Sequence, residues 1–250
     1  MARRLPARFL LRSSRRAVLA MCVLPALAVA SAAETWRDAP LVAARYGNPT
    51  TRYPHGVLGD RVEYGALELD YGAQTFRIVL PQTRVFEDVA PRLADVDGDG
   101  QSEAVVVESD SQQGARLAIY NAAGLMAATP FIGTRFRWLA PIGIGDLDGD
   151  GHVELAYIDR PHLAKTLRVW RFRAGALEPV ANRPGLTNHR IGEPDIAGGL
   201  RDCGSGPEMI TADSGWRRLV SSQLIGTDIV SRDIGAHRGR ASFADALNCP

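Results

Sequence analysis

The chain is poor in lysine and cysteine, and it has no long apolar run after its first 33 residues. Lys165 is the only lysine, and no basic stripe offers a grip on a polyphosphate, so we expect no nucleic-acid partner. The sequence after residue 33 has no apolar stretch at helical spacing, which predicts neither a membrane span nor a helical fold there. The five histidines show no metal-ligand spacing such as HExxH, so zinc hydrolysis has no support.

Residues 1–33 have the features of an export signal peptide. They contain six arginines and no acidic residue, followed by an apolar stretch over 17–30 and a small-residue segment at 30–33. The Arg15-Arg16 pair lies in a segment that resembles the twin-arginine signal of bacteria, and the general secretory route is the alternative. Removal of this segment would leave 23 basic and 28 acidic residues, a net charge of −5. We therefore expect an exported protein, periplasmic or extracellular, with residues 34–250 as its single domain.

Of the three cysteines, only Cys203 and Cys249 lie outside the predicted signal. An oxidising compartment makes a disulfide between them reasonable, and it would attach the carboxy-terminal tail to the body of the domain. Two buried free thiols are the alternative.

Two nine-residue segments, 95–103 and 146–154, share one pattern of acids and glycines. Each has acidic residues at positions 1, 3, 5 and 9 and glycine at positions 4 and 6. Carboxylates this close repel one another unless a hard cation lies between them, and glycine permits the tight turn. The pattern predicts calcium loops, although acidic turns without a metal remain possible.

Each acidic segment lies within a longer repeated unit. A short strand enters the loop, an apolar strand leaves it, and a polar turn leads to a further strand. A third copy keeps only Asp195, Asp202 and Glu208, and a faint copy surrounds Asp60 and Glu63. We place the repeats at about 53–86, 89–135, 138–185 and 189–230.

Units of this length with about four short strands are typical of propeller blades. We therefore predict an all-β fold, a β-propeller of about four to five four-stranded blades, with calcium loops in at least two of them. The segments 36–46 and 225–243 could supply strands to a fifth blade.

The acidic loops and their flanking strands resemble the FG-GAP or VCBS repeats of calcium-binding propellers, which are similar to the integrin α-subunit head. The resemblance implies two calcium sites. The implied ligands of the first are the side chains of Asp95, Asp97, Asp99 and Glu103 and the carbonyl of Gln101. Those of the second are the side chains of Asp146, Asp148, Asp150 and Glu154 and the carbonyl of His152. An EF-hand would need an acid at position 12, where Val106 and Tyr157 stand.

The sequence gives no catalytic residue, and whether the protein is an enzyme stays open. A calcium ion held wholly by protein ligands stabilises a scaffold and lacks the open position of a Lewis-acid site. We expect an exported calcium-binding propeller that acts as a binding or scaffold module for an envelope protein or a glycan. The alternatives are a glycan-directed hydrolase, lyase or lectin and a structural stabiliser of another envelope protein. Five aromatic residues form either a sugar-stacking platform or core packing: Tyr120, Trp138, Trp170, Phe172 and Trp216.

Overall fold

The computed structural model describes residues 39–249, together with Met1. The predicted export signal over residues 1–33 lies outside the described residues. The described strands and helix are β1 (Ala43–Thr50), β2 (Glu63–Asp70), β3 (Thr75–Val79), β4 (Arg84–Phe86), β5 (Arg92–Ala94), β6 (Glu103–Asp110), β7 (Gly114–Asn121), β8 (Gly124–Ala128), β9 (Leu139–Gly145), β10 (Glu154–Asp159), β11 (Thr166–Arg173), β12 (Ala176–Pro184), β13 (Leu186–Thr187), β14 (Gly199–Asp202), β15 (Pro207–Asp213), β16 (Arg218–Ile225), β17 (Asp228–Ala236) and α1 (Arg240–Leu247). Within the described part, no helix is long and apolar enough to cross a membrane.

The strands form four successive repeats, each built around one central strand. Repeat 1 contains β1–β3, repeat 2 contains β4–β8, repeat 3 contains β9–β12 and repeat 4 contains β13–β17. Every central strand begins at or beside a buried glutamate and ends on an aspartate. The four pairs are Glu63 and Asp70, Glu103 and Asp110, Glu154 and Asp159, and Glu208 and Asp213. The central strands of the four repeats therefore begin and end at equivalent acidic residues.

The strand that precedes the central one is divided in two of the repeats. In repeat 2, β4 pairs with residues 108–110 of the central strand and β5 pairs with residues 103–105. In repeat 4, β13 pairs with residues 212–213 of the central strand β15, and β14 pairs with residues 207–210. In repeat 3, the undivided strand β9 pairs with the whole of the central strand β10, with a register shift between Ala156 and Tyr157. The segments between the divided strands leave the sheet and place polar side chains, among them Glu87 and His189, in buried positions.

Apolar side chains on both faces of the central strands pack successive repeats against one another. In β6, Ala104 and Val106 contribute to the cluster shared with repeat 1, whereas Val105 and Val107 contribute to the cluster shared with repeat 3. A strand covered on both faces needs a continuous apolar run, because neighbouring residues point to opposite sides. The same alternation operates in β10 between repeats 2 and 4.

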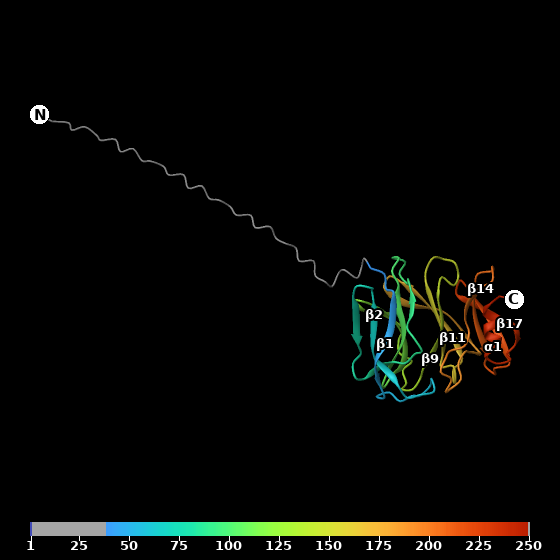
Figure 1. Cartoon of the computed structure of the whole chain (residues 1–250). Coiled ribbons are helices and arrows are strands. Elements are labelled where there is room, and N and C mark those ends of the chain that lie inside the picture. The colour runs from blue at the N-terminus through green and yellow to red at the C-terminus, as the bar shows by residue number, and fades with distance from the viewer. Residues whose placement is uncertain (2–38, 250) are drawn as a thin grey trace. The chain divides into compact units, whose positions relative to one another are not determined.

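The repeats follow one another in chain order from β1 and β2 at one end of the described fold to α1 at the other (Figure 1). Helix α1 packs Phe243 onto Ile210, Ala212 and Leu219, which lie on the face of repeat 4 that points away from repeat 3. The helix thereby covers apolar surface that no other sheet of residues 39–249 covers.

The fold is all-β, as the sequence predicts, apart from one short helix that the sequence does not predict. Repeats 1 and 2 share one hydrogen-bonded sheet through the pairing of Tyr64 with Phe86, whereas repeats 3 and 4 each have a sheet of their own. The two segments expected to supply a fifth blade have other places: β1 pairs with β2, and β17 pairs with β16. The number of propeller blades stays a prediction.

A disulfide joins Cys203 to Cys249, as predicted from the sequence. It connects the turn between β14 and β15 to the residue that follows α1 by two positions. With the cysteines 46 positions apart in sequence, the chain-entropy treatment gives a stabilisation of about 4 kcal/mol. The bond holds the covering helix close to the last sheet.

Candidate metal loops

The first acidic loop connects β5 to β6 and is organised by its own aspartates. Asp95 accepts hydrogen bonds from the backbone N–H groups of Gly98 (2.8 Å) and Gly100 (3.0 Å). Asp97 accepts from the N–H of Asp99 at 3.1 Å, and Asp99 accepts from that of Gln101 at 2.7 Å. Both glycines have positive φ, 78° and 89°, a conformation that side chains disfavour. The Asp and Gly spacing therefore determines the turn locally.

The second loop, between β9 and β10, repeats this arrangement. Asp146 accepts from the N–H groups of Gly149 (2.7 Å) and Gly151 (3.0 Å), and Asp150 accepts from that of His152 (2.9 Å). Burial acts to raise the pKa of Asp146, but the N–H groups of Gly151 and Gly149 hold this pKa below its usual value. Equivalent sequence thus produces equivalent backbone.

The glutamate at position 9 closes each loop from the first residue of the central strand. Glu103 accepts a hydrogen bond from the N–H of Val96 at 3.0 Å, and Glu154 accepts one from that of Leu147 at 2.8 Å. Burial raises the pKa of Glu103 to about 7, and the charge of Asp97 adds to the shift. Burial also raises the pKa of Glu154, where Arg171 acts in the opposite direction.

Three carboxylates converge in each loop. Oxygens of Asp95, Asp97 and Asp99 lie within 4.8 Å of one another, as do those of Asp146, Asp148 and Glu154. Calcium–oxygen distances of about 2.4 Å place opposite ligands about 4.8 Å apart, so the oxygens of either set are close enough together to contact one ion. Of the predicted side chains, Glu103 and Asp150 lie outside these sets. The carbonyl contacts of Gln101 and His152 stay predictions.

The two loops differ in their charge balance. Arg171 lies against the second loop, with Nε 2.5 Å from Glu154 Oε1 and the terminal nitrogens 2.6 Å from Asp148 and 2.9 Å from Asp150. Across residues 39–249, no arginine or lysine lies within ion-pair distance of the acidic side chains of the first loop. Those side chains are Asp95, Asp97, Asp99 and Glu103. Sequence reasoning missed Arg171, because its contact with the loop depends on the pairing of β10 with β11.

The outer repeats do not assemble a third acidic loop within the described residues. In repeat 4, Glu208 is bound by Arg201 at 2.6 Å and by Arg232 at 2.5 Å, while Asp195 pairs with Arg240. In repeat 1, burial raises the pKa of Glu63 to about 9, and the charge of Glu87 adds to the shift.

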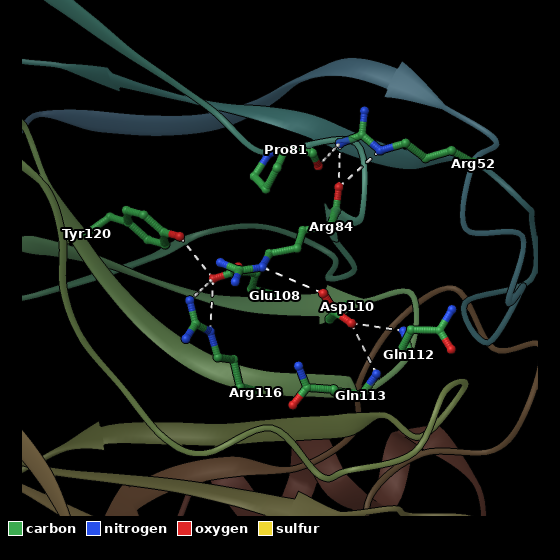
Figure 2. Close-up of polar contacts among 9 residues, drawn as sticks. All are labelled: Arg52, Pro81, Arg84, Glu108, Asp110, Gln112, Gln113, Arg116 and Tyr120. Carbon is green, nitrogen blue, oxygen red and sulfur yellow. Dashed lines mark hydrogen bonds and ion pairs between the residues drawn. The ribbon is translucent and has the colours of Figure 1, made fainter.

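A buried network at the far end of β6 also escaped sequence reasoning (Figure 2). Glu108 is fully buried and accepts hydrogen bonds from Arg84 (3.1 Å), Arg116 (2.8 Å) and Tyr120 (2.9 Å). Asp110 accepts from the N–H groups of Gln112 and Gln113 and so caps the β6–β7 turn. Arg52 donates to the carbonyl of Arg84 and to that of Pro81. The signal in the sequence was Glu108, the acid that directly follows the apolar run 104–107.

Three histidines from different repeats gather around Trp138. His162 and His189 share a hydrogen bond of 3.0 Å between ring nitrogens, and the His189 and Trp138 rings lie 4.9 Å apart. His55 bonds the buried Glu87 at 2.5 Å. Burial lowers the pKa of His162 to about 4, and the neighbouring histidines add to the shift. The adjoining cavity, about 30 Å³, is large enough for about one water molecule.

The aromatic residues proposed as a sugar platform do not form one surface. Trp138, Tyr120 and Phe172 are core residues, exposed by 2%, 3% and 6%. Trp170 packs at the edge of the cluster between repeats 2 and 3, and Trp216 packs beside α1. Core packing accounts for Tyr120, Trp138 and Phe172, whereas Trp170 and Trp216 are half-buried at separate places.

Residues 95–157 match the family described as FG-GAP-like repeat. The chain carries an FG-GAP-like repeat. The match begins at the first aspartate of the first loop, contains the whole of the second loop and ends within β10. It therefore includes both candidate metal loops and the strands between them. A comparison with curated protein sequences gives no significant match.

Proposed function

We propose that this protein is an exported, calcium-stabilised module of propeller type that binds an envelope protein or a glycan. The observation that carries the proposal is the FG-GAP-like repeat whose first loop brings the oxygens of Asp95, Asp97 and Asp99 together. Folds of this kind hold their ligands on a surface assembled from several loops, while a loop metal keeps the scaffold rigid.

The residues of the first loop fit calcium. Their side chains supply carboxylate oxygens, the ligand type that this hard cation prefers, and no internal cation within the described part neutralises them. The side-chain oxygen of Gln101 is shielded from solvent and has no hydrogen-bond partner among the described residues. A bound calcium ion would neutralise Asp95, Asp97 and Asp99 and connect β5 to β6.

The cavity between repeats 2 and 3 lacks the pair of carboxyl groups that glycan cleavage requires. A glycosidase needs two carboxyl groups that face one substrate. The cavity of about 170 Å³ between repeats 2 and 3 is lined by Tyr157 and Trp170, and its one carboxylate is Asp159. Asp159 is already bound by Arg160 at 2.8 Å and by Arg168 at 2.9 Å. These two arginines also hold the pKa of Asp159 below its usual value, against the effect of burial.

Export is supported by two features. Residues 1–33 have the composition of a signal peptide, and the Cys203–Cys249 disulfide is of the kind that persists in an oxidising compartment.

The calcium part of the proposal is tested by thermal unfolding of the purified protein with calcium and with EGTA. Calcium at about 100 times its dissociation constant should stabilise the fold by about 2.7 kcal/mol. For a domain of this size, that gain corresponds to a rise in Tm of about 5 to 10 °C. Equal melting temperatures, together with no heat of binding in calorimetry, would refute the calcium role.

The binding part is tested by affinity capture from the source's cell envelope in calcium and in EGTA. A protein partner should be retained in calcium and released by EGTA, whereas a glycan partner should be displaced by soluble sugar. A partner that loses its own stability when this chain is deleted would instead favour the stabiliser alternative. Cleaved sugar products would favour the hydrolase or lyase.

A further inference from the structure

Arg171 occupies the position of a counter-ion in the second acidic loop. Its guanidinium contacts three of the four predicted side chains of that loop, at 2.5 Å to Glu154, 2.6 Å to Asp148 and 2.9 Å to Asp150. The Arg171 side chain is only 20% exposed and the Glu154 side chain is fully buried. One planar cation thus satisfies acids at positions 3, 5 and 9 of the loop.

The sheet itself presents this arginine to the loop. Arg171 lies directly opposite Glu154 in the antiparallel pairing of β10 with β11, so their side chains share one face. Glu154 is fixed in turn by the N–H of Leu147, at 2.8 Å. The contact therefore follows from strand register and does not depend on the loop alone.

The first loop has no arginine opposite its glutamate. The pairing of Ala104 with Tyr120 places Asn121 opposite Glu103, one step further along the ladder. The Asn121 side chain is uncharged, and its oxygen accepts a hydrogen bond from the N–H of Ala123 at 3.0 Å in the following turn. Nothing at this position supplies a positive charge to the first loop.

In repeat 4, arginines also neutralise the glutamate at the start of the central strand. Glu208 stands where Glu103 and Glu154 stand in the earlier repeats, at the start of the central strand. It is bound by Arg201 from β14 at 2.6 Å and by Arg232 from β17 at 2.5 Å. Guanidinium groups therefore neutralise the loop glutamate in two successive repeats.

We infer that Arg171 acts as a built-in cation of the second loop, which leaves the first loop as the single high-affinity calcium site among the described residues. This inference rests on the proposed calcium role of the first loop. Calcium and Arg171 would compete for the same two carboxylates, Asp148 and Glu154, and the guanidinium already neutralises both. The second loop is held closed without metal, and only the first makes the fold depend on calcium.

Calcium titration of the full chain by calorimetry, with equilibrium dialysis for stoichiometry, tests the inference. The unmodified protein should bind one calcium ion tightly. Asp97→Asn should abolish that site, whereas Asp148→Asn should leave the stoichiometry at one. Arg171→Gln should raise it to two, with binding at the second loop tightened by about 100-fold, the effect of removing one close positive charge.

Arg168→Gln is the matched control, because Arg168 lies on the same strand but pairs with Asp159. It should leave the stoichiometry at one. If Arg171→Gln folds poorly, Asp148→Asn still decides the question, since loss of a tight calcium site in that variant would overturn the inference. Two tight sites in the unmodified protein, unaltered by Arg171→Gln, would overturn it while leaving the proposed function intact. Absence of any calcium binding by the unmodified protein would refute the proposed function itself.

Discussion

Glu108→Gln should be among the most destabilising conservative substitutions in this chain. The Glu108 side chain is 0% exposed and lies between Arg84, which is 33% exposed, and Arg116, which is 13% exposed. The amide keeps the shape of the side chain but removes the charge that both arginines face. Removing one member of a buried ion pair costs about 3 to 5 kcal/mol. Because Arg84 reaches solvent, we expect a loss of about 2 to 3 kcal/mol.

Urea unfolding followed by tryptophan fluorescence measures this loss as a shift in midpoint at constant m-value. Glu68→Gln is the matched control: Glu68 also faces two arginines, but Arg45 and Arg77 are 59% and 47% exposed. Exposed pairs contribute about 0 to 1 kcal/mol, so the control should be nearly silent. Equal costs for the two substitutions would show that burial does not govern the network and would refute the reasoning.

Three further predictions concern other parts of the fold. Replacing Cys203 and Cys249 by serine should lower the unfolding free energy by about 2 to 4 kcal/mol, measured by urea titration; an unchanged midpoint would show that the bond is not stabilising. His162 has a pKa of about 4 in the fold and a reference value of 6.5, so the unfolded chain binds its proton first and stability should fall as pH drops from about 7 to 4. His162→Gln should reduce that fall, and an identical pH profile would contradict the assignment. Gly114→Ala should destabilise strongly, because its Cβ would lie 2.2 Å from the carbonyl oxygen of Thr134 at a φ of +72°. Gly124→Ala, also at positive φ but in open space, is the control, and the difference in Tm reports the clash.

The acidic loops could be predicted from sequence because their geometry is local. Each aspartate of 95–99 bonds a backbone N–H at most five residues away, so the nine-residue pattern contains nearly all the information needed. The apolar strands that follow were equally visible, since burial on both faces requires an unbroken run such as 104–107.

The role of Arg171 could not be read in the same way. It depends on the register of β10 against β11, and a shift of one residue would turn the side chain to the other face. The gathering of His55, His162 and His189 depends on how three repeats stack, which no spacing in the sequence encodes. The joining of repeats 1 and 2 rests on one pairing between Tyr64 and Phe86, a contact between distant segments.

The two ends of the stack of repeats are the places where copies of the chain could associate. Repeat arrays can grow by adding copies wherever a terminal sheet offers an apolar face. Here α1 closes one end over Ile210 and Ala212, and at the other end the outward face of β2 carries Glu68, bound by Arg45 and Arg77. A chain cut after residue 236 would lose its helical cap and present an uncovered face to its neighbours. We therefore expect the short helix to oppose end-to-end association of copies, a role separate from any ligand the loops hold.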